Sequence, residues 1–249
     1  MTPLAALAVA GAGLAAGTIN TIVGSGSLIT FPTLLAFGFA PVVANVSNTV
    51  GLVPGSLSGA VAYRAELRGQ RARLLVLGTA SVAGGLTGGG LLLALPGTVF
   101  RNVVPALILV ACVLVAVQPW LAARLARRRR RAAHGGPGLF GSVFATGVYG
   151  GYFGAAQGVV LLSLLGIFLP DDLQRLNAAK NVLAFLVNGV AALLFVAVTN
   201  VSWEAAGLLA AGSVVGGQVG GRLGRRVPAP LLRLLIVVVG VVAAVLLLV

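Results

Sequence analysis

Polar side chains and glycines interrupt an apolar stretch near the start of the chain, GTINTIVGSGSLITFPTLL at residues 17–35. Glycine interrupts a helix, and Pro32 follows shortly after the start of the next one. A helix that begins at such a break has free N–H groups and the positive end of its dipole there, which suits an anion. In lipid, the unpaired backbone must face protein or a wet cavity. The candidate binding residues are Asn20, Gly24, Ser25, Gly26 and Ser27.

A similar interruption occurs in the second half of the chain, in YGGYFGAAQGVV at residues 149–160. Its candidate residues are Tyr152, Gln157 and Gly158. Glycine and serine also allow helices to pack closely in membranes. Packing alone does not need the polar side chains as well, so we favour a binding function for both breaks.

A polar helical turn follows each break, ANVSNT at residues 44–49 and LNAAKN at residues 176–181. In each turn, polar side chains recur at spacings that place them on one helix face. These side chains are expected to line the same site as the breaks. The candidates are Asn45, Asn48, Asn177, Lys180 and Asn181.

Lys180 is the only lysine and lies within a predicted membrane span. An ionisable side chain inside a membrane is a functional hypothesis by default. If it lies deep, its counter-ion is expected to be the substrate anion or cavity water, and exchange of its proton would provide a route to proton coupling. In the alternative interpretation, Lys180 reaches the membrane surface from a helix end and joins Asp171, Asp172 and Arg175.

The composition identifies the solvent of this chain as a lipid bilayer. Of 249 residues, 59% are hydrophobic and 8% charged, against about 25% charged in soluble domains. We predict an all-α, polytopic membrane helix bundle of about eight to ten segments, since about 20 apolar residues cross the hydrocarbon core. The expected spans are 4–23, 42–62, 74–95, 102–121, 139–157, 176–198, 205–221 and 231–249, and two shorter runs, 26–38 and 158–169, are short crossings or half-helices.

The formal charge of +13 comes from arginines in the gaps between spans, chiefly in 64–73, 124–131 and 222–226. This distribution is typical of cytoplasmic loops and not of a nucleic-acid-binding surface. The spans contain no set of residues for hydrolysis, redox chemistry or metal binding. We therefore expect no enzyme, including one that acts on lipid head groups, and no cofactor.

The two halves of the chain are related by an offset of 132 residues. Between 81–101 and 213–233, nine of 21 positions are identical, and four of the nine are glycines that we interpret as packing faces. Equivalent loops carry opposite charge bias, which favours inverted repeats over two parallel groups of four spans. The expected organisation is a first repeat at 1–122, a basic cytoplasmic linker at 123–138 and a second repeat at 139–249.

The order of these motifs resembles the sulfite exporter TauE/SafE family over nearly the whole chain. In the first half, the resemblance rests on residues 17–35, on ANVSNTVGLVPGSLSGAVAYR and on GGLTGGGLLLALP. In the second half, it rests on GGYFGAAQGVVLLSLLGIF, LNAAKNVLAFLVN and GGQVGGRLGRRVP. The family often has more glycine where this chain has Gly24-Ser25-Gly26-Ser27. The resemblance implies a multi-pass permease of the bacterial inner membrane that moves small sulfur-containing or carboxylate anions, coupled to an ion gradient.

The sequence therefore predicts a secondary transporter for a small anion, sulfite- or sulfonate-like or a small carboxylate. Its expected partners are that anion, protons, the lipid bilayer and further copies of the chain in a homo-oligomer, but no nucleic acid. The alternative is a membrane scaffold or assembly factor that packs against partners through its glycine-rich helix faces.

Overall fold

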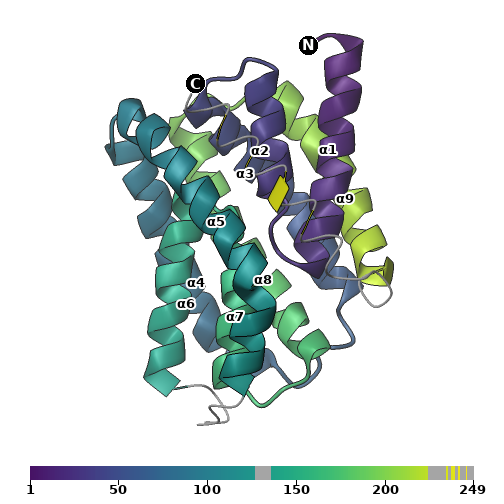
Figure 1. Cartoon of the computed structure of the whole chain (residues 1–249), viewed down its shortest axis with the longest axis vertical. Coiled ribbons are helices and arrows are strands. Elements are labelled where there is room, and N and C mark those ends of the chain that lie inside the picture. Colours follow the sequence, from purple (N-terminus) through teal and green to yellow (C-terminus); the bar gives the residue numbers. More distant parts are fainter. Residues whose placement is uncertain (127–135, 224–233, 235–236, 239–240, 242–244, 246–249) are drawn as a thin grey trace.

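A computed structural model describes residues 1–126 and 136–223, together with 234, 237–238, 241 and 245 (Figure 1). Every regular element in this part of the chain is a helix, which confirms the predicted fold class. The helices are α1 (Pro3–Ile22), α2 (Ser27–Ala36), α3 (Pro41–Ala62), α4 (Arg71–Ala94), α5 (Gly97–Ala126), α6 (Gly136–Tyr152), α7 (Gln157–Phe168), α8 (Leu173–Val198) and α9 (Trp203–Leu223).

Four of the described helices are long and apolar enough to cross a membrane by length and composition, namely α1, α4, the 97–117 part of α5, and α8. The two short predicted runs are the helices α2 and α7, of 10 and 12 residues. At 1.5 Å per residue they extend about 15–18 Å, half of the hydrocarbon thickness. They are therefore half-helices. The predicted span at 231–249 and the arginines at 127–131 lie largely outside the described residues.

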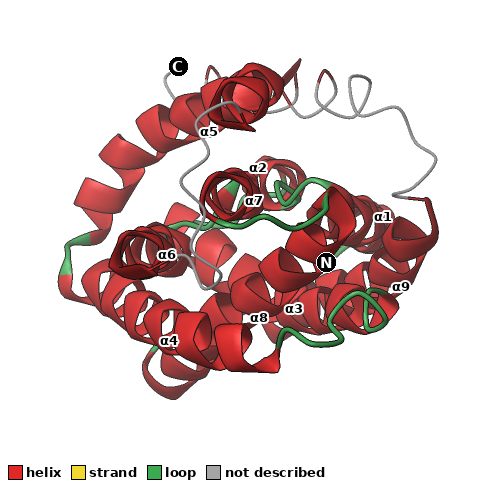
Figure 2. Cartoon of the chain, turned by 90° about the horizontal axis from the view of Figure 1, so that it is seen from below, coloured by secondary structure: helices red, strands yellow, loops and turns green. Residues whose placement is uncertain are grey.

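The half-helices belong to two hairpins that enter the bundle from opposite ends. Figure 1 shows α1 running down from the top and α6 running up from the bottom, each followed by its half-helix. Seen end-on, α2 and α7 lie in the middle, enclosed by the longer helices (Figure 2). This opposite direction suits an inverted repeat, but the orientation of the halves in the membrane stays a prediction. α5 extends through 123–126 and α6 begins at Gly136, so both helices enter the predicted linker.

Each hairpin packs on the glycine-rich helix of the other half. On α4, a Cβ added at Gly84 or Gly88 would overlap backbone carbonyl oxygens of α6. On α9, a Cβ at Gly212 or Gly216 would overlap carbonyl oxygens of α1 in the same way. The predicted use of these glycine faces for close packing is confirmed, and the packing is internal to the chain. Of the predicted glycines, Gly85 and Gly89 also contact α8, and Gly217 and Gly221 contact α3. The full predicted set is Gly84, Gly85, Gly88, Gly89, Gly216, Gly217, Gly220 and Gly221.

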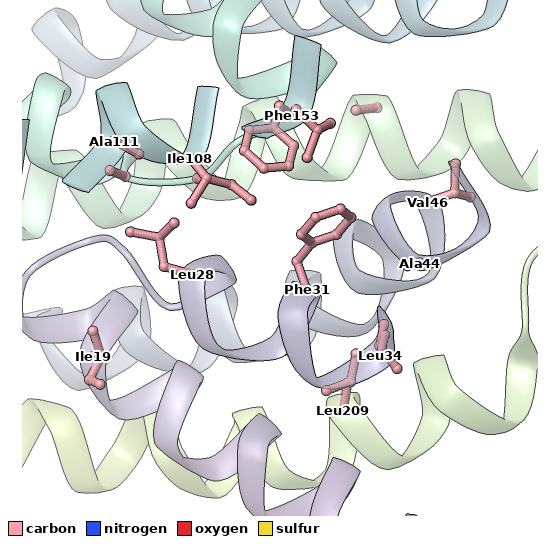
Figure 3. Close-up of a cluster of buried hydrophobic side chains, with 14 of the residues drawn as sticks. Ile19, Leu28, Phe31, Leu34, Ala44, Val46, Ile108, Ala111, Phe153 and Leu209 are labelled. Atoms are coloured by element: carbon pink, nitrogen blue, oxygen red, sulfur yellow. The ribbon is translucent and has the colours of Figure 1, made fainter. Parts of the chain in front are cut away.

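Aromatic side chains seal one side of the hairpins. The rings of Phe31 from α2 and Phe153 from the α6–α7 connection meet edge to face at 5.2 Å, and Phe100 from α5 lies 6.0–6.4 Å from both. Figure 3 shows Phe31 and Phe153 facing each other, with Ile108 of α5 nearby. Burying this cluster fixes the hairpins against α5. On the other side, Ser27 and Thr30 of α2 hydrogen-bond to Asn48 of α3.

Candidate functional site

The two helix breaks, residues 23–26 (first break) and 153–156 (second break), meet in the middle of the molecule. The N–H of Gly158 donates to the carbonyl oxygen of Gly24 at 3.0 Å. Gly24 has a φ of +94°, and a Cβ there would overlap Gly158 Cα. This contact brings the N-terminal ends of α2 and α7 together. Two positive helix-dipole ends thus converge on one place, as an anion site requires.

The second break lies slightly earlier than the sequence indicates. α6 ends at Tyr152, although the predicted span continues to residue 157. The reason is backbone conformation, because Gly154 and Ala156 have φ of 77° and 58° and cannot continue a right-handed helix. Ala156 is a non-glycine residue in the left-handed region, a strained conformation that the surrounding packing must hold.

A small cavity of about 20 Å³ lies beside the meeting point, large enough for a single water-sized molecule. Seven of the predicted site residues line it, and they come from the end of α1, the first break, the starts of α2 and α7, and α8. They are Asn20, Gly24, Ser27, Gln157, Gly158, Lys180 and Asn181. The other lining residues are Thr21, Ser56, Gly154, Ala184 and Asn188.

Lys180 lies on α8 and is 0% exposed. Its ammonium donates to the carbonyl oxygens of Asn20 at 2.7 Å and Thr21 at 3.3 Å, in the last turn of α1. These carbonyls have no helical partner because α1 ends at the first break. The interpretation of Lys180 as a residue that reaches the membrane surface is wrong, since the side chain turns inward to the broken helix end.

Asparagines from the polar turns complete the capping of the broken helices. Asn177 and Asn181 donate to the carbonyl oxygen of Thr21 at 3.0 and 3.4 Å. In the other half, Asn45 of α3 donates to the carbonyl oxygen of Tyr152 at 3.0 Å, at the end of α6. Each polar turn therefore caps the broken helix of the opposite half.

Two further side chains organise the first break. The carbonyl oxygen of the Asn20 side chain accepts the N–H of Gly26 at 2.6 Å. Asn48 accepts a hydrogen bond from Thr30 and donates to the hydroxyl of Ser27 at 3.2 Å. Asn20 thus bridges the end of α1 to the start of α2, and Asn48 holds the start of α2 against α3.

Gln157, the first residue of α7, brings an unpaired donor to the cavity. The side chain is 2% exposed, and its amide nitrogen has no hydrogen-bond partner among the described residues. It packs on Gly150, where a Cβ would overlap the amide. A buried donor without a partner costs about 1–3 kcal/mol, so this amide would gain from a hydrogen-bond acceptor.

Six predicted residues do not line the cavity, and each has another place. Asn45, Asn48 and Asn177 act as the caps and ties described above. The ring of Tyr152 packs on Phe100 with centroids 5.7 Å apart, in the aromatic cluster. The remaining two, Ser25 and Gly26, lie within the first break, and the hydroxyl of Ser25 is buried without a partner in the described structure.

The predicted site residues do not include Thr21, Ser56, Gly154, Ala184 and Asn188, which also line the cavity. The signal that could have found Ser56 is the repeat, because Ser56 and Asn188 are separated by the same 132 residues and lie on α3 and α8. Thr21 contributes through its backbone carbonyl, which the amino-acid type does not reveal.

A charged cluster joins the two halves at one end of the bundle. Arg73 at the start of α4 and Arg175 at the start of α8 both pair with Asp171, which lies between α7 and α8. Gln70 donates to the carbonyl oxygen of Arg175 at 3.0 Å. Burial acts to raise the pKa of Asp171, but the hydrogen bonds and charges of Arg73 and then Arg175 outweigh it, and the pKa lies below its usual value.

The arrangement matches one class of membrane protein. Broken helices whose ends meet inside a bundle, with two halves that pack crosswise, are the architecture of secondary transporters. Comparison with known families agrees, because residues 9–247 match the family described as sulfite exporter TauE/SafE. The chain belongs to this family, and it is a multi-pass membrane protein of a transporter family.

Curated relatives carry similar names. The chain is 27% identical over 238 residues to the "Probable membrane transporter protein YfcA" of Escherichia coli K12, covering 91% of this chain and 83% of that protein. It is 26% identical over 228 residues to a "Probable membrane transporter protein" of Haemophilus influenzae, covering 92% and 88%. A relative from Sinorhizobium sp, "Probable membrane transporter protein ORF9", is 26% identical over 239 residues. No solved structure matches the chain.

Proposed function

We propose that this protein is a secondary transporter that moves a small anion, sulfite- or sulfonate-like or a small carboxylate, across the bacterial inner membrane. The observation that carries the proposal is the meeting of the α2 and α7 N-termini at Gly24 and Gly158, beside the ammonium of Lys180. Two helix N-termini and a cation give this place a positive potential inside an apolar bundle.

In this proposal, the side chain of Gln157 binds the anion directly. Its amide nitrogen has no hydrogen-bond partner among the described residues, so it can donate to the anion without breaking an existing hydrogen bond. The cavity of about 20 Å³ admits no anion of the proposed class, so loading requires the hairpins and α8 to separate. Movement of one repeat against the other around a central site would provide this opening.

Lys180 is also the residue that we assign to proton coupling. When the anion enters, the ammonium leaves the carbonyls of Asn20 and Thr21 and turns to the anion. A lysine that changes partners in this way can take up or release a proton during the cycle, whereas arginine stays charged. We therefore expect Lys180→Arg to bind the anion but to lose transport driven by a proton gradient.

The scaffold alternative depends on glycine faces that are open to a partner. In the described structure, Gly90 and Gly207 face open space, whereas the eight predicted packing glycines of α4 and α9 lie against helices of the same chain. A partner protein would have to displace α1 or α6 to reach them. This observation favours transport over scaffolding.

Uptake into proteoliposomes tests the proposal, with sulfite, thiosulfate, sulfoacetate and acetate as labelled solutes. We expect uptake of at least one, about tenfold weaker apparent binding in Gln157→Leu, and a larger loss in Lys180→Gln. Tyr152→Phe is the matched control, because the ring of Tyr152 packs on Phe100 away from the cavity. Uptake that is unchanged in both Gln157→Leu and Lys180→Gln would exclude this site.

A further inference from the structure

We infer that the ammonium of Lys180 occupies an alkali-cation site, as a tethered replacement for a coupling sodium ion. This inference rests on the proposed transport function and specifies its cation. It predicts that transport by the wild-type protein needs no sodium, and that removing the lysine side chain creates a protein that binds sodium at the same place.

The first argument is the set of atoms around the ammonium. Lys180 donates to two backbone carbonyl oxygens at the C-terminal end of α1, at 2.7 and 3.3 Å. Among the residues that the structure describes, no ion pair joins it to a carboxylate. In transporters with broken helices, carbonyls of unwound backbone and the C-terminal ends of half-helices are the groups that hold sodium. The ammonium of Lys180 therefore lies where such a cation would lie.

The second argument is an unpaired oxygen on Asn177, a residue that shares an acceptor with Lys180. Asn177 donates through its nitrogen to the carbonyl of Thr21, one of the two oxygens that Lys180 contacts. Its side-chain oxygen is buried and has no hydrogen-bond partner in the described part of the chain, and the residue is only 4% exposed. Two carbonyl oxygens therefore contact the ammonium, and a residue that shares one of them carries a buried, unpaired amide oxygen. Carbonyl and amide oxygens are ligands of hard cations, so the unpaired oxygen is available to an ion once the ammonium is removed.

The third argument comes from the repeat. The residue 132 positions before Lys180 is Asn48, which bonds to Ser27 and Thr30 and not to the broken end of α6. The carbonyl of Tyr152 at that end receives a neutral amide from Asn45 instead. Only the end of α1 is therefore supplied with a positive charge in the described structure. The described part of the chain thus carries one such charge, which is the charge of one coupling sodium ion.

Thermal unfolding of the purified protein tests the cation site without any substrate. Lys180→Ser shortens the side chain and leaves room and oxygens for an ion. We expect its midpoint to rise with sodium chloride in a saturable manner, by about 3–6 °C at ten times the Kd, relative to choline chloride of equal strength. The wild-type midpoint should be the same in both salts.

Two variants are matched controls for this measurement. Lys180→Gln keeps most of the length and directs an amide N–H to the same carbonyls, so it should show no sodium effect. Asn48→Ser makes the corresponding truncation in the other half, where no cation-like contact exists, and should also be indifferent to sodium. A Lys180→Ser protein that remains folded and shows no sodium shift beyond these controls overturns the inference.

Uptake by the wild-type protein gives an independent reading if Lys180→Ser does not fold. Equal uptake in sodium and choline media supports the tethered cation, and uptake that requires sodium contradicts it. The outcomes also separate this inference from the proposed function. A sodium shift in Lys180→Ser together with no uptake of any anion by the wild type would keep the cation site and reject anion transport.

Discussion

The C-terminal ends of α1 and α6 occupy equivalent positions in the two halves, yet their carbonyls are capped by different groups. At α1, the carbonyl of Thr21 receives donors from Asn177, Lys180 and Asn181. At α6, the carbonyl of Tyr152 receives one donor, from Asn45. The helix-breaking geometry is thus common to both halves, whereas the charge is placed in only one. The difference teaches that two hairpins with similar breaks can hold a site that is not itself symmetric.

The largest effect is expected where the two breaks touch. Gly24→Ala places a Cβ in the left-handed region and against Gly158 Cα, so it combines backbone strain with a backbone clash. We expect a loss of about 3 kcal/mol or more in the free energy of unfolding, measured by denaturant unfolding in detergent. Gly38→Ala separates the two causes, because Gly38 has a φ of +84° but open space around its Cβ direction. Equal losses in the two variants would mean that the contact between the breaks does not matter.

A smaller effect should distinguish the two caps. Asn45→Ala leaves the buried carbonyl of Tyr152 without the side-chain donor that it has now, at a cost of about 2 kcal/mol. Asn177→Ala should cost less, about 1 kcal/mol, because Lys180 and Asn181 still donate to the carbonyl of Thr21. Unfolding of the two variants side by side gives the comparison. A larger loss in Asn177→Ala would contradict the redundancy of the α1 cap.

The smallest effect concerns the charged cluster, which also occurs in one half only. The position equivalent to Asp171 is Phe39, which packs on the hydrophobic core instead of pairing with arginine. Because the folded pKa of Asp171 is lowered, its pairing stabilises the protein above the unfolded pKa of about 4 and is lost as pH falls through the folded pKa. Asp171→Asn should lose about 1 kcal/mol at neutral pH and show a flatter acid dependence of the unfolding midpoint.

Asp172→Asn is the control for this prediction. Asp172 caps the start of α8 through the N–H of Arg175, and asparagine is an equally good cap. The variant should keep the stability and the acid dependence of the wild type. If both substitutions behave alike, the arginines do not stabilise Asp171.

Most of the helices could be predicted from the sequence, because apolar runs of fixed length and glycine breaks are local signals. The short helices α2 and α7 were detectable for the same reason, from Gly24 and Gly26 in one half and the glycines around Gln157 in the other. The contents of the site were less accessible. The bond from Lys180 to Asn20 joins residues 160 positions apart, and its acceptor is a backbone atom. No pattern of residue types encodes such a partner.

The sequence alone does not determine the depth of Lys180, for a related physical reason. The residue lies in the second turn of α8, close enough to Arg175 for its long side chain to reach the membrane surface. Only the position of the end of α1 decides that the side chain turns inward. Similarly, Asn45 and Asn177 were recognised as polar residues on one helix face, but their role as caps depends on the helix end that lies opposite.

The crosswise packing of the hairpins has a consequence for how the protein is made. α1 rests on α9, whose first residue, Trp203, leaves the ribosome about 180 residues after α1, or about 10–40 s later at usual synthesis rates. During this interval the first hairpin is inserted without its glycine-rich support, and its broken backbone lacks the donors of α8. The nascent chain must therefore be sheltered by the insertion machinery or by water until synthesis is nearly complete. Assembly of this membrane protein is a late event in its biogenesis, because neither half carries the partner that its own hairpin requires.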